Sequence, residues 1–279
     1  MMIIEQKSFD EERALYHLED SEVRSCRFAG PADGESALKE SHRITVSDCS
    51  FELRYPLWHC TNFTLTRCRM SETARAALWY NEAGVLEGCE LGGIKALREG
   101  RNLSLRRCRI LSQEFGWKCR DVSLTDSEVT AEYLFLDSRN VSLKNVKMKG
   151  KYSFQYMEDL TIEDSVLDTK DAFWHSKHVT VRNSTVKGEY LAWFSEDLTL
   201  DHCHIIGTQP LCYCKGLKLI DCTMEGCDLA FEYSEVEASV KGHIDSVKNP
   251  RLGTILCDSV GEVIMKDAAM PCIGRVQLR

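Results

Sequence analysis

Apolar and polar residues alternate in short segments that recur along the chain at a fixed spacing. Leu103-Ser104-Leu105 is followed 19 residues later by Val122-Ser123-Leu124. The same pattern begins at other positions with this spacing: Ile44, Phe63, Val141, Leu160, Val179, Leu198 and Leu217. One interval, from Phe63 to Gly84, is two residues longer. Strict alternation over a few residues is typical of a strand with one buried face, so each repeat is expected to contribute such a strand.

Polar residues that suit turns follow each segment, and no repeat shows helical periodicity over ten or more residues. Nineteen residues of extended chain cover roughly 60 Å, which suits three short strands joined by bends. The repeat therefore predicts an all-β fold, a single-stranded right-handed parallel β-helix with 19-residue rungs and short terminal caps. We expect about 11 or 12 rungs of this kind.

The repeat also predicts the domain organisation. We expect one β-helix domain over residues 1–279, with a cap at 1–20, regular rungs at 21–234, and irregular last rungs with a C-terminal cap at 235–279. In the first cap, Ser8 and Glu11 have the spacing of a capping box, which favours a short helix over 8–18, although an irregular cap fits equally. Caps are expected because an open strand edge would pair with other chains.

Charge and composition exclude several classes of partner. The net charge is −8 and the pI is near 5.6, which argues against binding to a nucleic-acid backbone. No apolar run approaches the roughly 18 residues of a membrane span, and no signal peptide is evident at the N-terminus. We therefore expect a cytoplasmic protein with no nucleic-acid partner, no membrane partner and no cofactor.

The 14 cysteines fall mainly in two columns of equal repeat phase, such as Cys49, Cys68, Cys89 and Cys108. Small side chains at one phase suit a tight interior corner, so we expect buried and reduced thiols. In an alternative interpretation, Cys212 and Cys214 bind zinc together with the nearby Cys203. A second matched cysteine pair is missing, so we expect no metal.

One part of each repeat has a different character. The residues four before each segment form a titratable column that contains Glu40, His59, Tyr80, Glu99, Lys118 and Asp137. The preceding column holds all five tryptophans, and the column before that is mostly Leu or Phe. A bend after the Leu/Phe column would expose both other columns and avoid burying charges. In the alternative arrangement, the tryptophans belong to the core.

An exposed row of aromatic and titratable side chains is the candidate site. We expect Glu40, His59 and Glu99 to be the residues that could act in acid–base chemistry. The expected ligand-binding residues are Lys39, Trp58, Trp79, Tyr80, Arg98, Trp117, Lys118 and Asp137. Aromatic faces beside polar groups suit a carbohydrate or an anionic small molecule, bound with or without lyase, hydrolase or epimerase action. The alternative is a non-catalytic scaffold that contacts a protein, or a second copy of itself, through the aromatic face.

Several phrases lie outside the logic of the repeat. They are Gly30-Pro-Ala-Asp-Gly-Glu-Ser-Ala-Leu-Lys-Glu40, Arg54-Tyr-Pro-Leu-Trp-His59, Arg75-Ala-Ala-Leu-Trp-Tyr80, Gly93-Ile-Lys-Ala-Leu-Arg-Glu99 and Asp171-Ala-Phe-Trp-His175. With these phrases, the chain resembles the DUF3737 family of uncharacterised bacterial proteins over essentially its whole length. That resemblance implies a bacterial β-helix protein and no particular activity. The repeat also resembles the pectin-lyase-like β-helix superfamily, which implies architecture alone.

Overall fold

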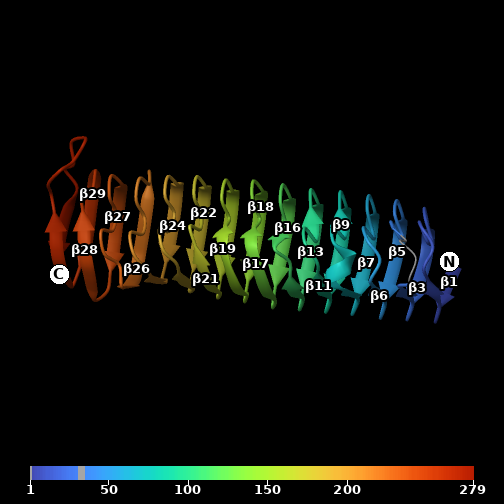
Figure 1. Ribbon diagram of the computed structural model, residues 1–279. Coiled ribbons are helices and arrows are strands. Elements are labelled where there is room, and N and C mark those ends of the chain that lie inside the picture. The colour runs from blue at the N-terminus through green and yellow to red at the C-terminus, as the bar shows by residue number, and fades with distance from the viewer. Residues whose placement is uncertain (1, 31–34) are drawn as a thin grey trace. The chain divides into compact units, whose positions relative to one another are not determined.

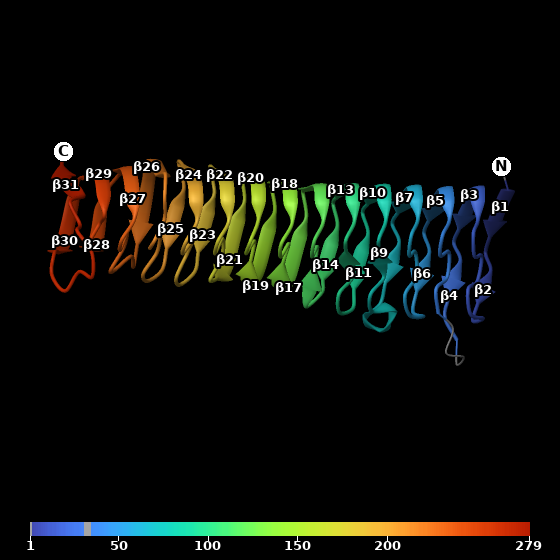
Figure 2. The same ribbon diagram turned by 90° about the horizontal axis from the view of Figure 1, so that it is seen from above.

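The computed structural model describes residues 2–30 and 35–279. They form two compact units, residues 1–141 and 142–279, which are described separately. Both units consist of parallel strands wound as successive turns of a β-solenoid (Figure 1, Figure 2). The predicted all-β parallel coil is therefore confirmed.

In the first unit, each rung begins with a first strand and continues into a shorter second strand. The first strands are β1 (Met2–Glu5), β3 (Glu19–Arg24), β5 (His42–Ser47), β7 (Thr61–Thr66), β10 (Glu82–Glu87), β13 (Arg101–Arg106) and β16 (Arg120–Thr125). The second strands are β2 (Ser8–Phe9), β4 (Arg27–Phe28), β6 (Ser50–Phe51), β8 (Arg69–Met70), β11 (Glu90–Gly92), β14 (Arg109–Leu111) and β17 (Glu128–Leu134). Short third strands are β9 (Leu78–Trp79), β12 (Leu97–Arg98) and β15 (Glu114–Phe115), and a 3-10 helix η1 spans Glu72–Ala74. Strand β18 (Arg139–Lys144) spans the boundary between the units.

The second unit repeats this arrangement. Its first strands are β20 (Glu158–Glu163), β22 (Lys177–Arg182), β24 (Glu196–Asp201), β26 (Leu217–Glu225), β27 (Glu235–Val240), β29 (Leu252–Cys257) and β31 (Arg275–Leu278). The other strands are β19 (Lys147–Ser153), β21 (Val166–Lys170), β23 (Thr185–Lys187), β25 (His204–Ile206), β28 (His243–Lys248) and β30 (Ser259–Ile264). The register Val179↔Leu198 confirms the 19-residue rung here, as Leu103↔Val122 does in the first unit.

The corner before each first strand explains how the chain bends. Leu57 and His59 both have left-handed backbone conformations, with φ of 54° and 56°. The N–H of Leu57 donates to Ala37 O of the preceding rung, and that of His59 donates to Trp79 O of the following rung. Leu57 is buried and His59 is exposed. The bend therefore places the Leu/Phe column in the core and the titratable column in solvent, as expected, while the tryptophans are half-buried.

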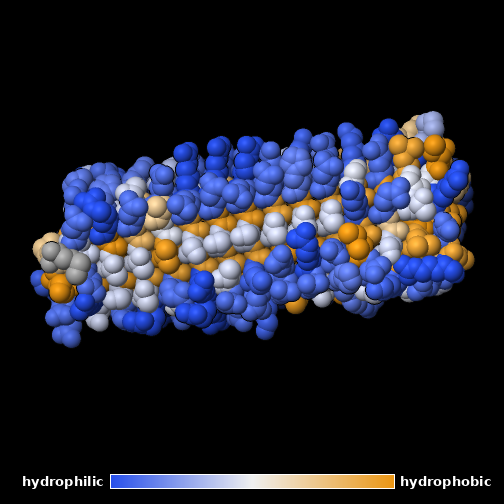
Figure 3. Space-filling model, turned by 180° about the vertical axis from the view of Figure 1, so that it is seen from behind, coloured by the Kyte–Doolittle hydropathy of each residue, from blue (hydrophilic) through white to orange (hydrophobic). Residues whose placement is uncertain are grey.

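Stacked side chains of one kind fill the interior of each unit. Phe28 and Phe51 stack at 4.7 Å in the first unit, and Phe154 and Phe173 at 5.3 Å in the second. All 14 cysteines are free and all except the half-buried Cys272 are buried, which confirms the prediction for the cysteine columns. On the surface, hydrophilic side chains form bands beside a strip of residues of intermediate hydropathy (Figure 3).

The expected number of rungs is wrong, and of the two forms considered for the first cap the helix is not found. The segment 8–18 forms no helix, because β1 pairs in register with β3 and makes the N-terminal segment a rung of its own. Strands pair in parallel through β31, so the coil has about 14 turns rather than 11 or 12. The rung from Ser21 to Ile44 is also longer than 19 residues, and its residues 31–34, part of the phrase Gly30–Glu40, lie outside the described residues.

A register slip changes the columns near the end of the regular repeat. Glu232 has the 19-residue phase of the titratable column, yet Tyr233 has the left-handed φ, and its ring lies against that of Tyr213, tilted by 38° with centroids 5.6 Å apart. Phe231 correspondingly takes a buried core position rather than a place in the tryptophan column. The register Leu217↔Val236 keeps the 19-residue spacing, so the shift is confined to this corner. Among the described residues, no helix has the length and apolar character needed to cross a membrane.

Candidate functional site

The predicted site residues form a continuous surface at one corner of the first unit. We call this surface the wall, and it consists of Lys39, Glu40, Trp58, His59, Trp79, Tyr80, Arg98, Glu99, Trp117, Lys118 and Asp137. Backbone hydrogen bonds stack it rung on rung: Glu40 N–H donates to Trp58 O (2.7 Å), and Tyr80 N–H donates to Arg98 O (3.1 Å). The structure therefore brings together the columns that were expected to be adjacent.

Aromatic rings of the wall stack mainly on each other. Trp58 and Trp79 are parallel within 4°, with centroids 5.2 Å apart, and His59 stacks on Tyr80 at 4.8 Å. Tyr80 meets the two indoles edge-on. The Arg98 guanidinium lies 5.2 Å from the Trp79 ring and 5.8 Å from the Trp117 ring. Because neighbouring rings and Arg98 occupy these aromatic faces, the wall presents mainly ring edges rather than an open stacking platform.

The tryptophans also hold the corner together. The indole N–H of Trp79 donates to Lys95 O (2.7 Å), and Trp58 bonds Ala76 O in the same way. Trp193 in the second unit donates to Gln209 O (2.8 Å). Trp117 is an exception, because its Nε1 is buried without a hydrogen-bond partner. The tryptophans are thus partly structural, as the alternative interpretation proposed, although their side chains are half-exposed.

Glu40 is held by a residue that the sequence did not indicate. The Tyr16 hydroxyl donates to Glu40 Oε2 (2.5 Å), and Lys39 Nζ lies 3.9 Å from Glu40 Oε1. The Tyr16 hydrogen bond, with the nearby positive charge of Lys39, lowers the pKa of Glu40 from its ordinary value. The same hydrogen bond raises the pKa of Tyr16. Tyr16 lies in the segment expected to be a cap, so no repeat phase pointed to it.

The chemistry that this arrangement supports is limited. A general acid at neutral pH needs a carboxyl with a raised pKa, whereas the pKa of Glu40 is lowered. Arg98 Nε lies 3.4 Å from Glu99 Oε1, so its charge is already compensated. Lys118 and Asp137 are exposed at the end of the wall. The wall is therefore suited to hydrogen bonding, and less to proton donation or to capture of an anion.

A groove with a volume of about 670 Å³ lies on another part of the first unit, beside the second strands. Sequence reasoning missed it. Its lining residues are Arg69, Met70, Ser71, Glu72, Glu90, Leu91, Gly92, Gly93, Ile94, Arg109, Leu111, Ser112, Gln113, Thr130, Ala131 and Glu132. The groove contains none of the wall residues.

A loop and two glycines shape one side of the groove. The two-residue extension of the rung between Phe63 and Gly84 contains η1, which follows β8. A Cβ on Gly92 would lie 2.7 Å from Met70 O, and one on Gly93 would lie 2.8 Å from Arg75 N. Only glycine allows the loop to pack this closely, and Gly93 also has a φ of 87°. The longer rung and the glycine pair are the sequence signals that could have indicated this groove.

The groove combines an apolar surface with polar groups. Leu111 is 66% exposed, a high value for leucine. Arg69 Nε lies 3.6 Å from Glu90 Oε2, and Gln113 Nε2 donates to Glu132 Oε2 (3.1 Å). Among the described residues, Arg109 forms no ion pair, so its guanidinium donors remain available to a ligand.

Comparisons with known proteins identify a family. A family model described as "Protein of unknown function (DUF3737)" matches residues 2–274. None of the curated proteins matches the chain.

Solved structures with a similar fold include PfbA, a surface adhesin of Streptococcus pneumoniae, at 7% identity and a TM-score of 0.47, with 84% of this chain and 83% of that chain covered. Another is the A-module of the mannuronan C-5 epimerase AlgE4 of Azotobacter vinelandii, at 8% identity and a TM-score of 0.32, with 98% and 89% covered. The catalytic domain of a GH87 α-1,3-glucanase has 9% identity and a TM-score of 0.34, with 99% and 63% covered. Likeness at this level carries no argument about activity.

Proposed function

The chain belongs to the DUF3737 family, and because that family has no known function, we propose from the geometry of the first unit that the protein binds a neutral oligosaccharide in its groove. The observation that carries this proposal is the groove itself. Its volume of about 670 Å³ lies within the roughly 300–1,000 Å³ typical of small-molecule sites.

The groove lining matches the two surfaces of a sugar ring. The exposed Leu111 offers an apolar contact for ring C–H groups. Arg109, Gln113 and Glu132 offer donors and acceptors for hydroxyl groups. A polyhydroxylated ligand uses both kinds of contact at once.

Charge favours a neutral ligand over an anionic one. The lining holds three glutamates (Glu72, Glu90 and Glu132) and two arginines, a balance of −1. Arg69 is already close to Glu90. A uronate or phosphate would meet this excess of carboxylates, whereas hydroxyl groups can donate hydrogen bonds to them.

We propose binding without turnover. Glycoside cleavage requires a proton donor beside the leaving oxygen. Glu40, the wall carboxylate predicted to act in acid–base chemistry, is instead held ionised by Tyr16. The wall thus supports the corner and is not part of the proposed binding groove.

The test is a glycan array followed by titration calorimetry, with neutral and uronate-containing oligosaccharides compared. We expect neutral glycans to bind, and Leu111→Asp and Arg109→Ala to weaken their binding about tenfold or more. The matched controls, His59→Ala and Lys118→Ala in the wall, should retain the affinity. Loss of binding in the wall variants alone would move the site to the wall, and binding of uronates alone would contradict the charge argument.

A second candidate function is self-association through the aromatic face. In the second unit, Tyr156, His175, Phe194 and Tyr213 form a ladder of stacked rings. Tyr156 is 55% exposed and Phe194 is 41% exposed. Sedimentation velocity should then show a dimer that Phe194→Lys dissociates, and a wild-type monomer at every concentration would exclude this candidate.

A further inference from the structure

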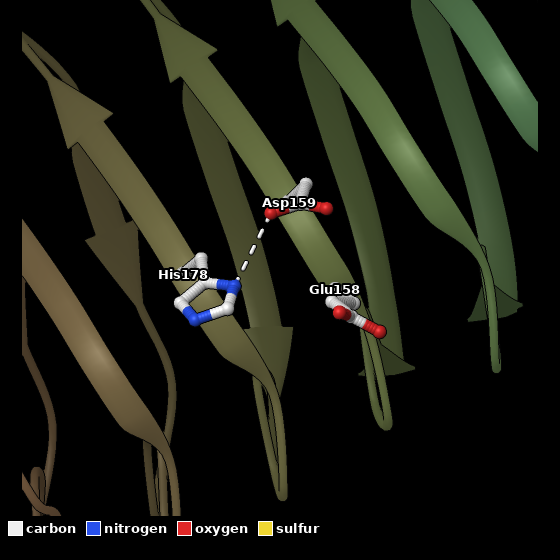
Figure 4. Close-up of side chains that lie close together, drawn as sticks. All are labelled: Glu158, Asp159 and His178. Atoms are coloured by element: carbon white, nitrogen blue, oxygen red, sulfur yellow. Dashed lines mark hydrogen bonds and ion pairs between the residues drawn. The ribbon is translucent and has the colours of Figure 1, made fainter.

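Three potential metal ligands converge on the surface of the second unit. Glu158 and Asp159 begin β20, and His178 lies one rung further on, in β22 (Figure 4). One ligand atom from each residue lies within 4.8 Å of the other two. His178 Nδ1 is 3.2 Å from Asp159 Oδ1. The group contains no residue of the wall or of the groove.

The corner geometry explains this convergence. The register pairs Glu158 with Lys177, so Asp159 and His178 occupy equivalent positions in consecutive rungs. Asp159 and His178 have left-handed φ values of 59° and 52°. This conformation interrupts the alternation of side chains in a strand, which lets Glu158 and Asp159 approach the same imidazole.

His178 faces a carboxylate on each side. Its Nδ1 is near Asp159, while its Nε2 is 3.9 Å from Asp197 Oδ2 in the following rung. A neutral imidazole carries one N–H and can donate to only one of them. A metal ion bound at Nδ1 would leave the N–H on Nε2, on the side of Asp197.

We infer that Glu158, Asp159 and His178 bind a divalent transition metal ion of the zinc class. One imidazole nitrogen with carboxylate oxygens suits zinc, cobalt or nickel, whereas calcium and magnesium prefer oxygen ligands alone. Three protein ligands leave one position of a tetrahedral site for water or an anionic group. Asp159 and His178 are about half exposed, with side-chain exposures of 51% and 54%, so an ion can reach them. This inference is independent of the oligosaccharide proposal, which concerns the other unit.

The test is titration of the full chain, free of any affinity tag, with zinc chloride under reducing conditions. We expect one site whose affinity falls at least tenfold in His178→Asn and in Asp159→Asn. His204→Asn is the matched control, because His204 is a surface imidazole of the same unit with a single carboxylate nearby, Glu225 at 3.1 Å. Its affinity for zinc should equal that of the wild type.

Further measurements separate the metal from its alternatives. Calcium chloride should give no comparable binding, and Cys272→Ser should retain the zinc affinity, because Cys272 is the one cysteine that is not buried. Loss of zinc binding in Cys272→Ser would assign the ion to the thiol and overturn the inference. Absence of zinc binding, or equal affinity in His178→Asn, would overturn the inference.

Discussion

The Tyr16 hydroxyl donates a hydrogen bond to Glu40 Oε2, with 2.5 Å between the oxygens, and so joins the N-terminal rung to the wall. The contact joins neighbouring rungs across two adjacent columns, because the register Ser21↔Ile44 gives Tyr16 the phase of Lys39. It makes the wall partly dependent on the N-terminal rung.

Replacing Tyr16 with phenylalanine should raise the pKa of Glu40 toward its ordinary value, because the hydroxyl that stabilises the carboxylate is removed. A carboxyl with a depressed pKa stabilises the fold above its unfolded-state pKa, and this stabilisation is lost as the pH falls through the folded-state pKa. The difference in melting temperature between Tyr16→Phe and wild type should therefore shrink in acid. An NMR titration of the Glu40 carboxyl measures the shift directly, with Tyr80→Phe as control. Identical Glu40 titrations in Tyr16→Phe and wild type would contradict this prediction.

Two matched substitutions measure how much an indole hydrogen bond contributes to the free energy of unfolding. Trp79→Phe removes the donor to Lys95 O, whereas Trp117→Phe removes an N–H that has no partner. Both lose similar ring area and a contact with Arg98. We expect Trp79→Phe to reduce the free energy of unfolding by about 1 kcal/mol more than Trp117→Phe. Urea denaturation measures both, and equal losses would show that the hydrogen bond contributes little.

The buried cysteines should be protected from thiol reagents in the native protein. Burial raises the pKa of Cys60 and of Cys119 to about 12, so at pH 8 their reactive thiolate forms are scarce. We expect a thiol reagent to label Cys272 rapidly in the native state and all 14 cysteines after unfolding. Rapid native labelling of several cysteines, located by peptide mass spectrometry, would be the contrary result.

Asp171 should destabilise the second unit at neutral pH. Its side chain is buried, Oδ1 has no hydrogen-bond partner, and burial raises the pKa of the carboxyl. A carboxyl whose pKa is higher in the folded state stabilises the fold while it is protonated. This stabilisation is complete below the unfolded-state pKa, and it is lost as the pH rises through the folded-state pKa. Asp171→Asn should therefore stabilise the protein at pH 7 by about 1 kcal/mol, with a smaller gain in acid.

The control for this substitution is Asp164→Asn, an exposed position with a similar left-handed φ of 51°. It should leave the melting temperature nearly unchanged. If Asp171→Asn destabilises the protein at pH 7, the buried carboxylate has a favourable role that its unpaired oxygen does not reveal.

The repeat predicted the fold because a single spacing governs both backbone pairing and side-chain burial. The register Leu103↔Val122 is the one that alternation in the sequence implies. The exposure of His59 was likewise predictable, since burial of an entire titratable column would cost too much. Left-handed backbone at Leu57 was not predictable, because residues of this type rarely adopt it and only the stacked neighbours enforce it.

Features that depart from the repeat were not predicted, because the prediction relied on a single spacing shared by the rungs. The contact of Tyr16 with Glu40 crosses phases, and the groove depends on one longer rung with Gly92 and Gly93 packed against its loop. The shift from Glu232 to Tyr233 is confined to one corner, since the register Leu217↔Val236 keeps the 19-residue spacing. A method based on spacing detects what the rungs share, whereas the candidate groove lies where one rung differs.

The shared rung also restricts how a gene of this kind can change length. Loss or duplication of 19 codons, the interval from Leu103 to Val122, would remove or add one complete rung. The backbone donors and acceptors of the neighbouring rungs would then still pair in the same register. Loss of a single codon within a first strand would turn the side chains beyond it to the opposite face of that strand. Such a chain should therefore grow or shrink by whole turns, and smaller insertions should be tolerated at corners such as the loop that bears η1.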